Sequence, residues 1–256
     1  MRSLVSIIRQ SIWSFRFLVA ILGTVLLLLL SCTEGLVQSF RTAELIAFEW
    51  HTELIISAMG GDGMSLALPF LAALPFTTAF IDDIKSGFIK VYLPRSGLNQ
   101  YIFGKAIACA ISGGLAILLG TLLAYVIVAL VVLPIEVIPT VVVGTEKPPW
   151  SPPPIWGEFA MLFGSGCFWS LVGLLLASLT NSRYMAYAGP FVVCYVLIIL
   201  YERYFDSLYV LYPREWLNPS ELWVLGAWGV AILLIVLSGV LGCIFAFWAR
   251  RKLVLE

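Results

Sequence analysis

Long apolar stretches separated by polar segments dominate the pattern of this chain. A helix that crosses about 30 Å of hydrocarbon needs about 20 mostly apolar residues, and six stretches approach or exceed this length. They lack the strict alternation of barrel strands. The pattern therefore predicts an all-α integral membrane protein with six transmembrane helices, over Phe17–Ser31, Met64–Phe80, Ala106–Leu133, Phe159–Leu179, Met185–Leu200 and Leu222–Trp248.

The segment before the first apolar stretch has an amphipathic pattern. Apolar residues recur at helical spacing between Leu4 and Phe15, and Arg2, Arg9 and Arg16 mark the polar side. A helix of this kind lies along a membrane surface. We therefore predict one transmembrane domain over residues 1–256, with an interfacial helix at 1–16, six spans within 17–248 and a basic tail at 249–256.

Composition supports the same class of protein. Hydrophobic residues make up 61% of the chain and charged residues 12%, whereas soluble globular chains have about 45–50% and about 25%. These values exclude a soluble enzyme, a nucleic-acid-binding domain and a disordered chain. We expect the lipid bilayer, and no nucleic acid, as a partner.

Basic residues are distributed unevenly between the two predicted sides of the membrane. With the N-terminus inside, 11 of the 15 lysines and arginines fall in inside segments and 4 in outside segments. Cytoplasmic loops carry such an excess of basic residues, so the count predicts that both termini are cytoplasmic.

Acidic residues show the opposite distribution, because 12 of the 15 fall outside. One interpretation is that acids accumulate outside by default, since they contribute little to orientation. The other is that clustered negative charge attracts a cationic cargo. The candidate cargo contacts of the first outside loop are Glu44, Glu49, Glu53 and Asp62.

A search for catalytic and metal-binding groups finds little. No predicted span carries an Asp, Glu, Lys, Arg or His near its middle, although proton relays and metal sites need such groups at depth. The five cysteines lack the close pairs of a metal site and are expected to be apolar packing residues. His51 is expected to be a solvated imidazole, with a metal site as the less favoured alternative. Because the sequence also lacks a phosphate-binding loop, we expect no catalytic residue, no metal and no cofactor bound by this chain, which is not an enzyme by itself.

Glycine and proline within the spans allow two interpretations. They can permit bending during alternating access, or they can reflect ordinary close packing of the helices. Both interpretations apply to Gly113, Gly114 and Gly120, which would loosen the third span as flexible points. The candidate hinges are Pro69, Pro75, Gly189 and Pro190.

The inside segment from Asp82 to Tyr101 predicts a short helix parallel to the membrane. Asp82 and Asp83 suit a helix N-terminus, and Pro94 and Gly97 would end the element. Its apolar face would be formed by Ile84, Phe88, Val91 and Tyr92. A lipid-surface helix without a partner would have the same pattern.

This region resembles a known family. The run from Pro75 to Asp83, followed by Lys85-Ser86-Gly87-Phe88-Ile89, Leu93-Pro94-Arg95 and Tyr101, resembles the segment between spans two and three of ABC-2-type transporter permeases. Residues 201–204 and 211–217 are similar to the loop before the last span of bacterial members. The resemblance covers almost the whole chain, although the first outside loop is longer and more acidic than in many members.

The resemblance implies a permease subunit of an ATP-driven exporter in the bacterial plasma membrane. Such subunits pair with a second permease subunit, identical or different, and bind cytoplasmic ABC ATPase subunits that hold ATP and Mg²⁺. The cargo would be an amphiphilic peptide, drug or lipid, and the N-terminal helix would touch the flank of the ATPase. The segment from Asp82 to Arg95 would be a coupling helix that docks in a groove of the ATPase, and the turn at 181–184 would be a second contact. The predicted coupling residues are Asp82, Asp83, Lys85, Gly87, Phe88, Arg95 and Arg183.

Two other classes of protein remain open at this point. An intramembrane enzyme would need buried polar catalytic groups, and a non-transporting scaffold or sensor would have no ATPase partner. Identification of a co-purifying ATPase separates the exporter from both.

Overall fold

The structure, a computed structural model, describes residues 2–42, 50–89, 97–131, 155–205, 208–220, 222–223 and 225–255. Every regular element within these ranges is a helix. In chain order they are α1 (Arg2–Ile12), α2 (Phe15–Ser31), α3 (Thr33–Thr42), α4 (Trp50–Met59), α5 (Asp62–Ala73), α6 (Ala79–Lys85), α8 (Leu98–Val131), α9 (Ile155–Thr180), α10 (Arg183–Tyr204), the 3₁₀ turn η1 (Tyr209–Leu211) and α11 (Ala227–Leu255).

The described helices form between four and six candidate membrane spans. Helices α8, α9, α10 and α11 are each long and apolar enough to do so alone. Two bent pairs reach the same length and hydropathy only together: α1 with α2, bent by 51°, and α4 with α5, bent by 71°. The all-helical architecture with several candidate membrane spans agrees with the prediction, and the count of six spans remains a prediction.

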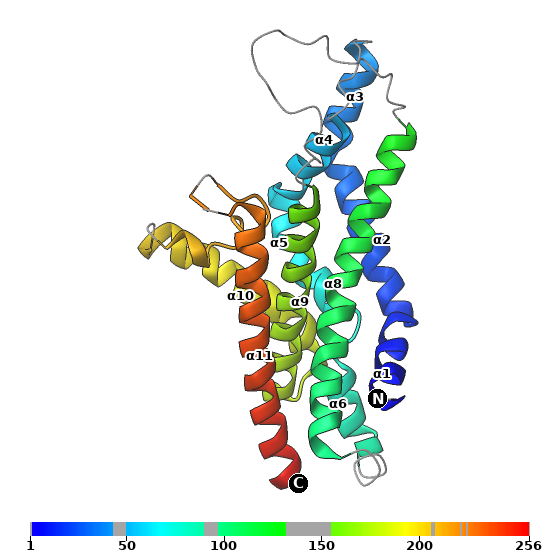
Figure 1. The fold of residues 1–256 in the computed structure, drawn as a ribbon, viewed down its shortest axis with the longest axis vertical. Helices are drawn as coiled ribbons and strands as arrows, with labels where there is room; N and C mark the ends of the chain where they lie inside the picture. The colour runs from blue at the N-terminus through cyan, green and yellow to red at the C-terminus, as the bar shows by residue number, and fades with distance from the viewer. Residues whose placement is uncertain are drawn as a thin grey trace.

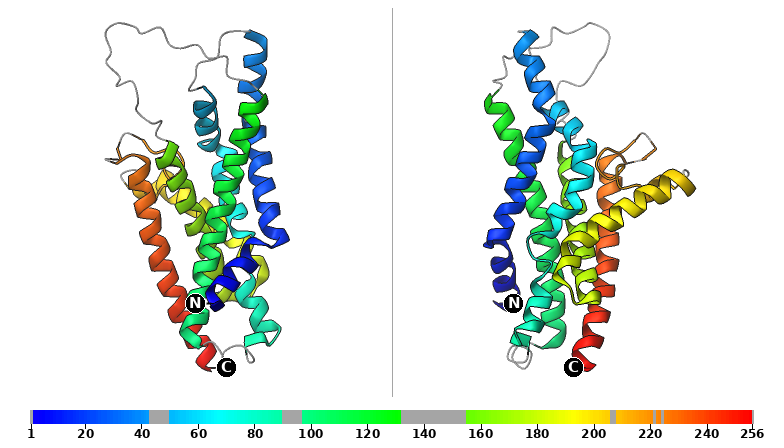
Figure 2. Two further views of the ribbon diagram at one scale, coloured as in Figure 1. Left: turned by 45° about the vertical axis from the view of Figure 1, so that its right-hand side comes forward. Right: turned by 180° about the vertical axis from the view of Figure 1, so that it is seen from behind.

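The helices stand largely side by side along the long axis of the molecule (Figure 1). Both chain termini and α6 lie at one end, called here the termini end, whereas α3 and α4 lie at the opposite end, called the far end. Helix α10 leaves the bundle at a steep tilt, which Figure 2 shows from behind.

Helix α9 occupies the centre of the bundle, in contact with α5, α6, α8, α10 and α11. Small residues let its neighbours approach closely. A Cβ added at Gly166 would lie 2.7 Å from the carbonyl oxygen of Gly113 on α8, and one added at Gly173 would lie 2.6 Å from that of Ala186 on α10. Since a Cβ cannot occupy these positions, glycine sets the helix spacing, and the packing interpretation of Gly113 is confirmed.

The second predicted span differs from the prediction, because it is not one continuous helix. Helix α5 ends at Ala73, a turn follows at residues 74–78, and α6 begins at Ala79. Pro75 lies in this turn, where it has no N–H to continue the helix. Pro69, by contrast, lies inside α5, and Gly189 and Pro190 lie inside α10. Motion at these four candidate hinges remains a prediction.

The predicted N-terminal helix is present as α1 and is separate from α2. Ser14 lies at the elbow between them, where its hydroxyl accepts a hydrogen bond from the backbone N–H of Phe17 at 3.2 Å and caps α2. Helix α1 folds back onto α8, so that Ile7 is buried and a Cβ added at Gly104 would lie 3.2 Å from its Cδ1. Its position is therefore fixed by the bundle as well as by any membrane surface.

We predict that Gly166→Ala destabilises the protein by about 1–3 kcal/mol, because the added methyl group forces α8 and α9 apart. The matched control is Gly239→Ala on α11, where a Cβ meets no atom within 4 Å. Thermal unfolding in detergent measures both variants. Equal midpoints for the two would show that the Gly113–Gly166 contact does not determine the packing of the bundle.

Candidate functional site

The end of α6 is set by a glycine. The backbone N–H of Ser86 donates to the carbonyl of Asp82 at 3.0 Å, and that of Gly87 donates to Ile84 at 3.1 Å. Gly87 has a φ of +71°, a left-handed conformation that glycine adopts without steric cost and that commonly ends helices. The predicted helix from Asp82 onward is therefore interrupted after Lys85. Arg95, the last predicted coupling residue of this segment, lies outside the described residues.

Asp82 joins three helices at the termini end. Its Oδ1 accepts a hydrogen bond from Nε of Arg183 on α10 at 2.6 Å. Its Oδ2 accepts one from the Thr78 hydroxyl at 3.1 Å and lies 3.8 Å from Nη1 of Arg16 on α2. Arg16 also donates to the Thr78 hydroxyl. Two of the predicted coupling residues, Asp82 and Arg183, are thus in direct contact although 101 positions separate them.

Asp83 makes a second ion pair that is more deeply buried. Its Oδ2 lies 2.8 Å from Nζ of Lys105 on α8 and accepts a hydrogen bond from the Tyr101 hydroxyl at 2.6 Å. The side chain of Lys105 is only 5% exposed, and its ammonium lies 4.8 Å from the ring centre of Phe76. The carboxylate and the ring compensate in part for removing the ammonium from water.

The ion pair of Lys105 was not predicted from the sequence, where this residue contributed only to the count of basic residues on the inside. A signal was present, because Tyr101 and Lys105 are four residues apart and therefore lie on the same face of a helix. Nothing in the sequence shows that this face meets Asp83.

Other predicted coupling residues lie on the surface of the termini end. Lys85 is exposed, and the Phe88 side chain is 48% exposed. The two carboxylates therefore point to partners within this chain, whereas Lys85 and Phe88 present a cation and an apolar ring outward.

At the far end, one of the predicted cargo-contact residues has a partner. Asp62 at the start of α5 lies 3.2 Å from Nη2 of Arg214, and its side chain is 77% exposed. Glu53 is exposed on α4. Glu44 and Glu49 lie outside the described residues, so the predicted acidic cluster is described only at Glu53 and Asp62.

The loop that contains Arg214 is anchored in the bundle by an aromatic side chain. Trp216 is 1% exposed and packs against Phe168 and Trp169 of α9, with ring centres 5.2 and 5.8 Å away. Nearby, burial raises the pKa of the Tyr212 phenol, whose ring stacks on Tyr201 at 4.2 Å. The 3₁₀ turn η1 lies in the same loop.

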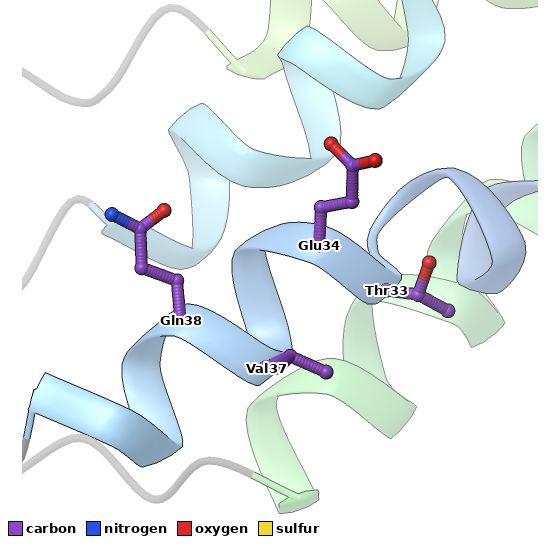
Figure 3. Close-up of a pocket in the computed structure, with 4 residues that line it drawn as sticks. All are labelled: Thr33, Glu34, Val37 and Gln38. Carbon is purple, nitrogen blue, oxygen red and sulfur yellow. The ribbon is translucent and has the colours of Figure 1, made fainter.

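A cavity of about 510 Å³ lies beside α3 at the far end. Figure 3 shows that its described lining comes from one helix, with Glu34 and Gln38 directed to the same side. The lining residues are Thr33, Glu34, Val37 and Gln38.

One expectation about an individual residue is wrong. His51 is 4% exposed, and its ring lies edge-on to Trp50 at 5.3 Å, because α4 packs against α2 and α8. It is therefore not a solvated imidazole. Cys32, Cys109, Cys167 and Cys194 are buried, in agreement with a packing role, and Cys243 lies on the exposed surface of the apolar helix α11. Within the described residues, no three potential metal ligands lie together.

Comparisons with known proteins gave no match. No family model matches this chain, and no curated protein or solved structure matches it significantly. The function is therefore inferred from its own residues.

We predict that Lys105→Met destabilises the protein by about 3–5 kcal/mol, because it leaves the Asp83 carboxylate without its buried cation. Arg183→Met removes an ion pair whose arginine side chain is 57% exposed and should cost only about 0–1 kcal/mol. Chemical unfolding in detergent measures the free energy of unfolding of each variant. A larger decrease for Arg183→Met than for Lys105→Met would show that the Asp82–Arg183 pair is the more stabilising of the two.

Proposed function

We propose that this chain is the membrane permease subunit of an ATP-driven exporter of the ABC-2 type. The observation that carries the proposal is the cluster around Asp82. Three segments that the family resemblance assigns to ATPase contact meet there: the elbow after α1 through Arg16, α6 through Asp82, and the turn before α10 through Arg183. Segments that bind one partner have to lie at one end of the molecule.

In this proposal the termini end faces the cytoplasm of a bacterium, and the far end faces outward. The orientation is supported by the excess of basic residues in the segments assigned to the inside. Four helices cross singly and the two bent pairs provide the remaining crossings. A second permease subunit, identical or different, completes the pathway for an amphiphilic cargo.

The ion pairs provide a mechanical link in the proposed transport cycle. The ATPase binds ATP and Mg²⁺ and contacts the exposed surface formed by Lys85, Gly87 and Phe88, together with Arg95. A displacement of α6 is transmitted to α2 and α10 through Asp82, and to α8 through Asp83. The spanning helices therefore move with the segment that the ATPase holds.

The far end supplies the proposed cargo preference. Glu53 and Asp62 carry negative charge there and, together with the predicted contacts Glu44 and Glu49 of the same sequence segment, would favour a cationic amphiphile. Arg214 neutralises part of the charge of Asp62.

We predict that Phe88→Asp reduces co-purification of the ATPase, because the new carboxylate would be buried against the partner without a counter-ion. The loss of binding should be about tenfold or more, which corresponds to about 1.4 kcal/mol. The matched control is Ser57→Asp, which places the same charge on an exposed position of α4 at the far end. Both variants are purified by one tag, and the bound nucleotide-binding subunit is quantified by mass spectrometry.

Unchanged ATPase recovery with Phe88→Asp would exclude this surface as the contact. If no nucleotide-binding protein co-purifies with the wild-type chain under conditions that preserve membrane complexes, the exporter proposal fails and the scaffold alternative is favoured.

A further inference from the structure

A second cavity, of about 260 Å³, lies at the termini end between α1, the end of α6 and the start of α8. Its floor is formed by Tyr101 and Lys105, which are both buried. Its rim carries Ser6 and Gln10 of α1 and Ser86 after α6, which are exposed. The cavity therefore leads from a polar surface to a buried ammonium group.

The ion pair on the floor has hydrogen-bonding capacity left on both partners. Lys105 has three N–H donors, and among the described residues only the Oδ2 atom of Asp83 accepts from it. That same Oδ2 accepts from Tyr101, whereas Oδ1 of Asp83 has no hydrogen-bond partner in the described part of the chain. A ligand that accepts from Lys105 and donates to Asp83 satisfies both without breaking the pair.

The surroundings of this cavity match the headgroup level of a membrane. Helix α1 is amphipathic and packs against α8. The elbow one turn beyond Gln10 carries Trp13 and Phe15, whose side chains are 83% and 80% exposed. Aromatic residues of this kind collect at the boundary between acyl chains and headgroups, so phospholipids are the ligands nearest to the cavity.

We propose that this cavity binds the headgroup of phosphatidylethanolamine. The phosphate oxygens accept hydrogen bonds from Lys105, and the primary ammonium donates to Oδ1 of Asp83. These charge-assisted hydrogen bonds are the strong ones. Binding of the headgroup needs no ATPase, although Asp83 and Phe88 of the proposed coupling segment also line the cavity. A bound headgroup would hold α1 against α8 at the membrane surface.

The same chemistry discriminates against other common phospholipids. The glycerol headgroup of phosphatidylglycerol has no cation for Asp83, so its phosphate brings an unbalanced negative charge next to a carboxylate. The quaternary nitrogen of phosphatidylcholine has no N–H to donate. Binding should therefore be selective for the zwitterion with a primary amine.

The test is native mass spectrometry of the purified full chain with equimolar phosphatidylethanolamine, phosphatidylglycerol and phosphatidylcholine. The wild-type chain should retain phosphatidylethanolamine about tenfold or more over either competitor. The double variant Lys105→Gln/Asp83→Asn, which removes both charges together, should bind the three lipids equally. The matched control Asp82→Asn changes the neighbouring carboxylate, which does not line this cavity, and should keep the selectivity.

A second variant tests the proposal independently, in case the double variant does not fold. Gln10→Trp fills the rim from an exposed position of α1 and leaves the ion pair intact, and it should also remove the selectivity. Equal retention of the three lipids by the wild-type chain would overturn the proposal. So would a preference for phosphatidylglycerol, or selectivity that persists in both cavity variants.

Discussion

Two adjacent carboxylates, Asp82 and Asp83, hold the termini end of this protein together. Successive residues of a helix point about 100° apart, so neighbouring side chains on α6 reach different helices. Asp82 meets Arg183 of α10 and Arg16 of α2, and Asp83 meets Lys105 of α8. A single short helix thereby ties three long ones, and its position depends on the break at Pro75 that separates it from α5.

The middle of the bundle is held by packing rather than by charge. In lipid there is little hydrophobic gain from bringing helices together, so close contact between small residues contributes much of the stability. The Gly113–Gly166 crossing and the hydrogen bond from the Ser170 hydroxyl to the carbonyl of Cys109, at 3.1 Å, illustrate this. Rigid packing in the middle and ion pairs at one end together allow a displacement of α6 to reach the bundle.

The sequence predicts the apolar helices well, because hydropathy and length suffice to identify a helix that avoids unsatisfied backbone groups in lipid. It also places Asp82 and Gly87 in one segment, which the family resemblance assigns to ATPase contact. It does not predict that Lys105 and His51 are buried or that Trp216 enters the bundle. Each of these depends on which faces of distant helices meet, and periodicity along one segment does not contain that information.

The break in the second span is a further feature that the sequence predicts poorly. Apolar composition is continuous from Met64 to Phe80, and only Pro75 signals the turn. Pro69 and Pro190 lie inside helices without ending them, because neighbouring helices can compensate for a missing N–H in a membrane protein. A proline therefore marks a break only where the surrounding packing permits one.

The central claim is that the termini end, with α6 at its surface, binds a cytoplasmic ATPase. The most direct measurement is photo-crosslinking in living cells from a photoreactive amino acid at Lys85, with the same amino acid at Ser57 of the far end as the control. The account predicts a crosslink from position 85 to a nucleotide-binding protein with a phosphate-binding loop, and none to it from position 57. The account would be contradicted if the crosslinks from position 85 contained no such protein. It would also be contradicted if the same protein were crosslinked from both positions.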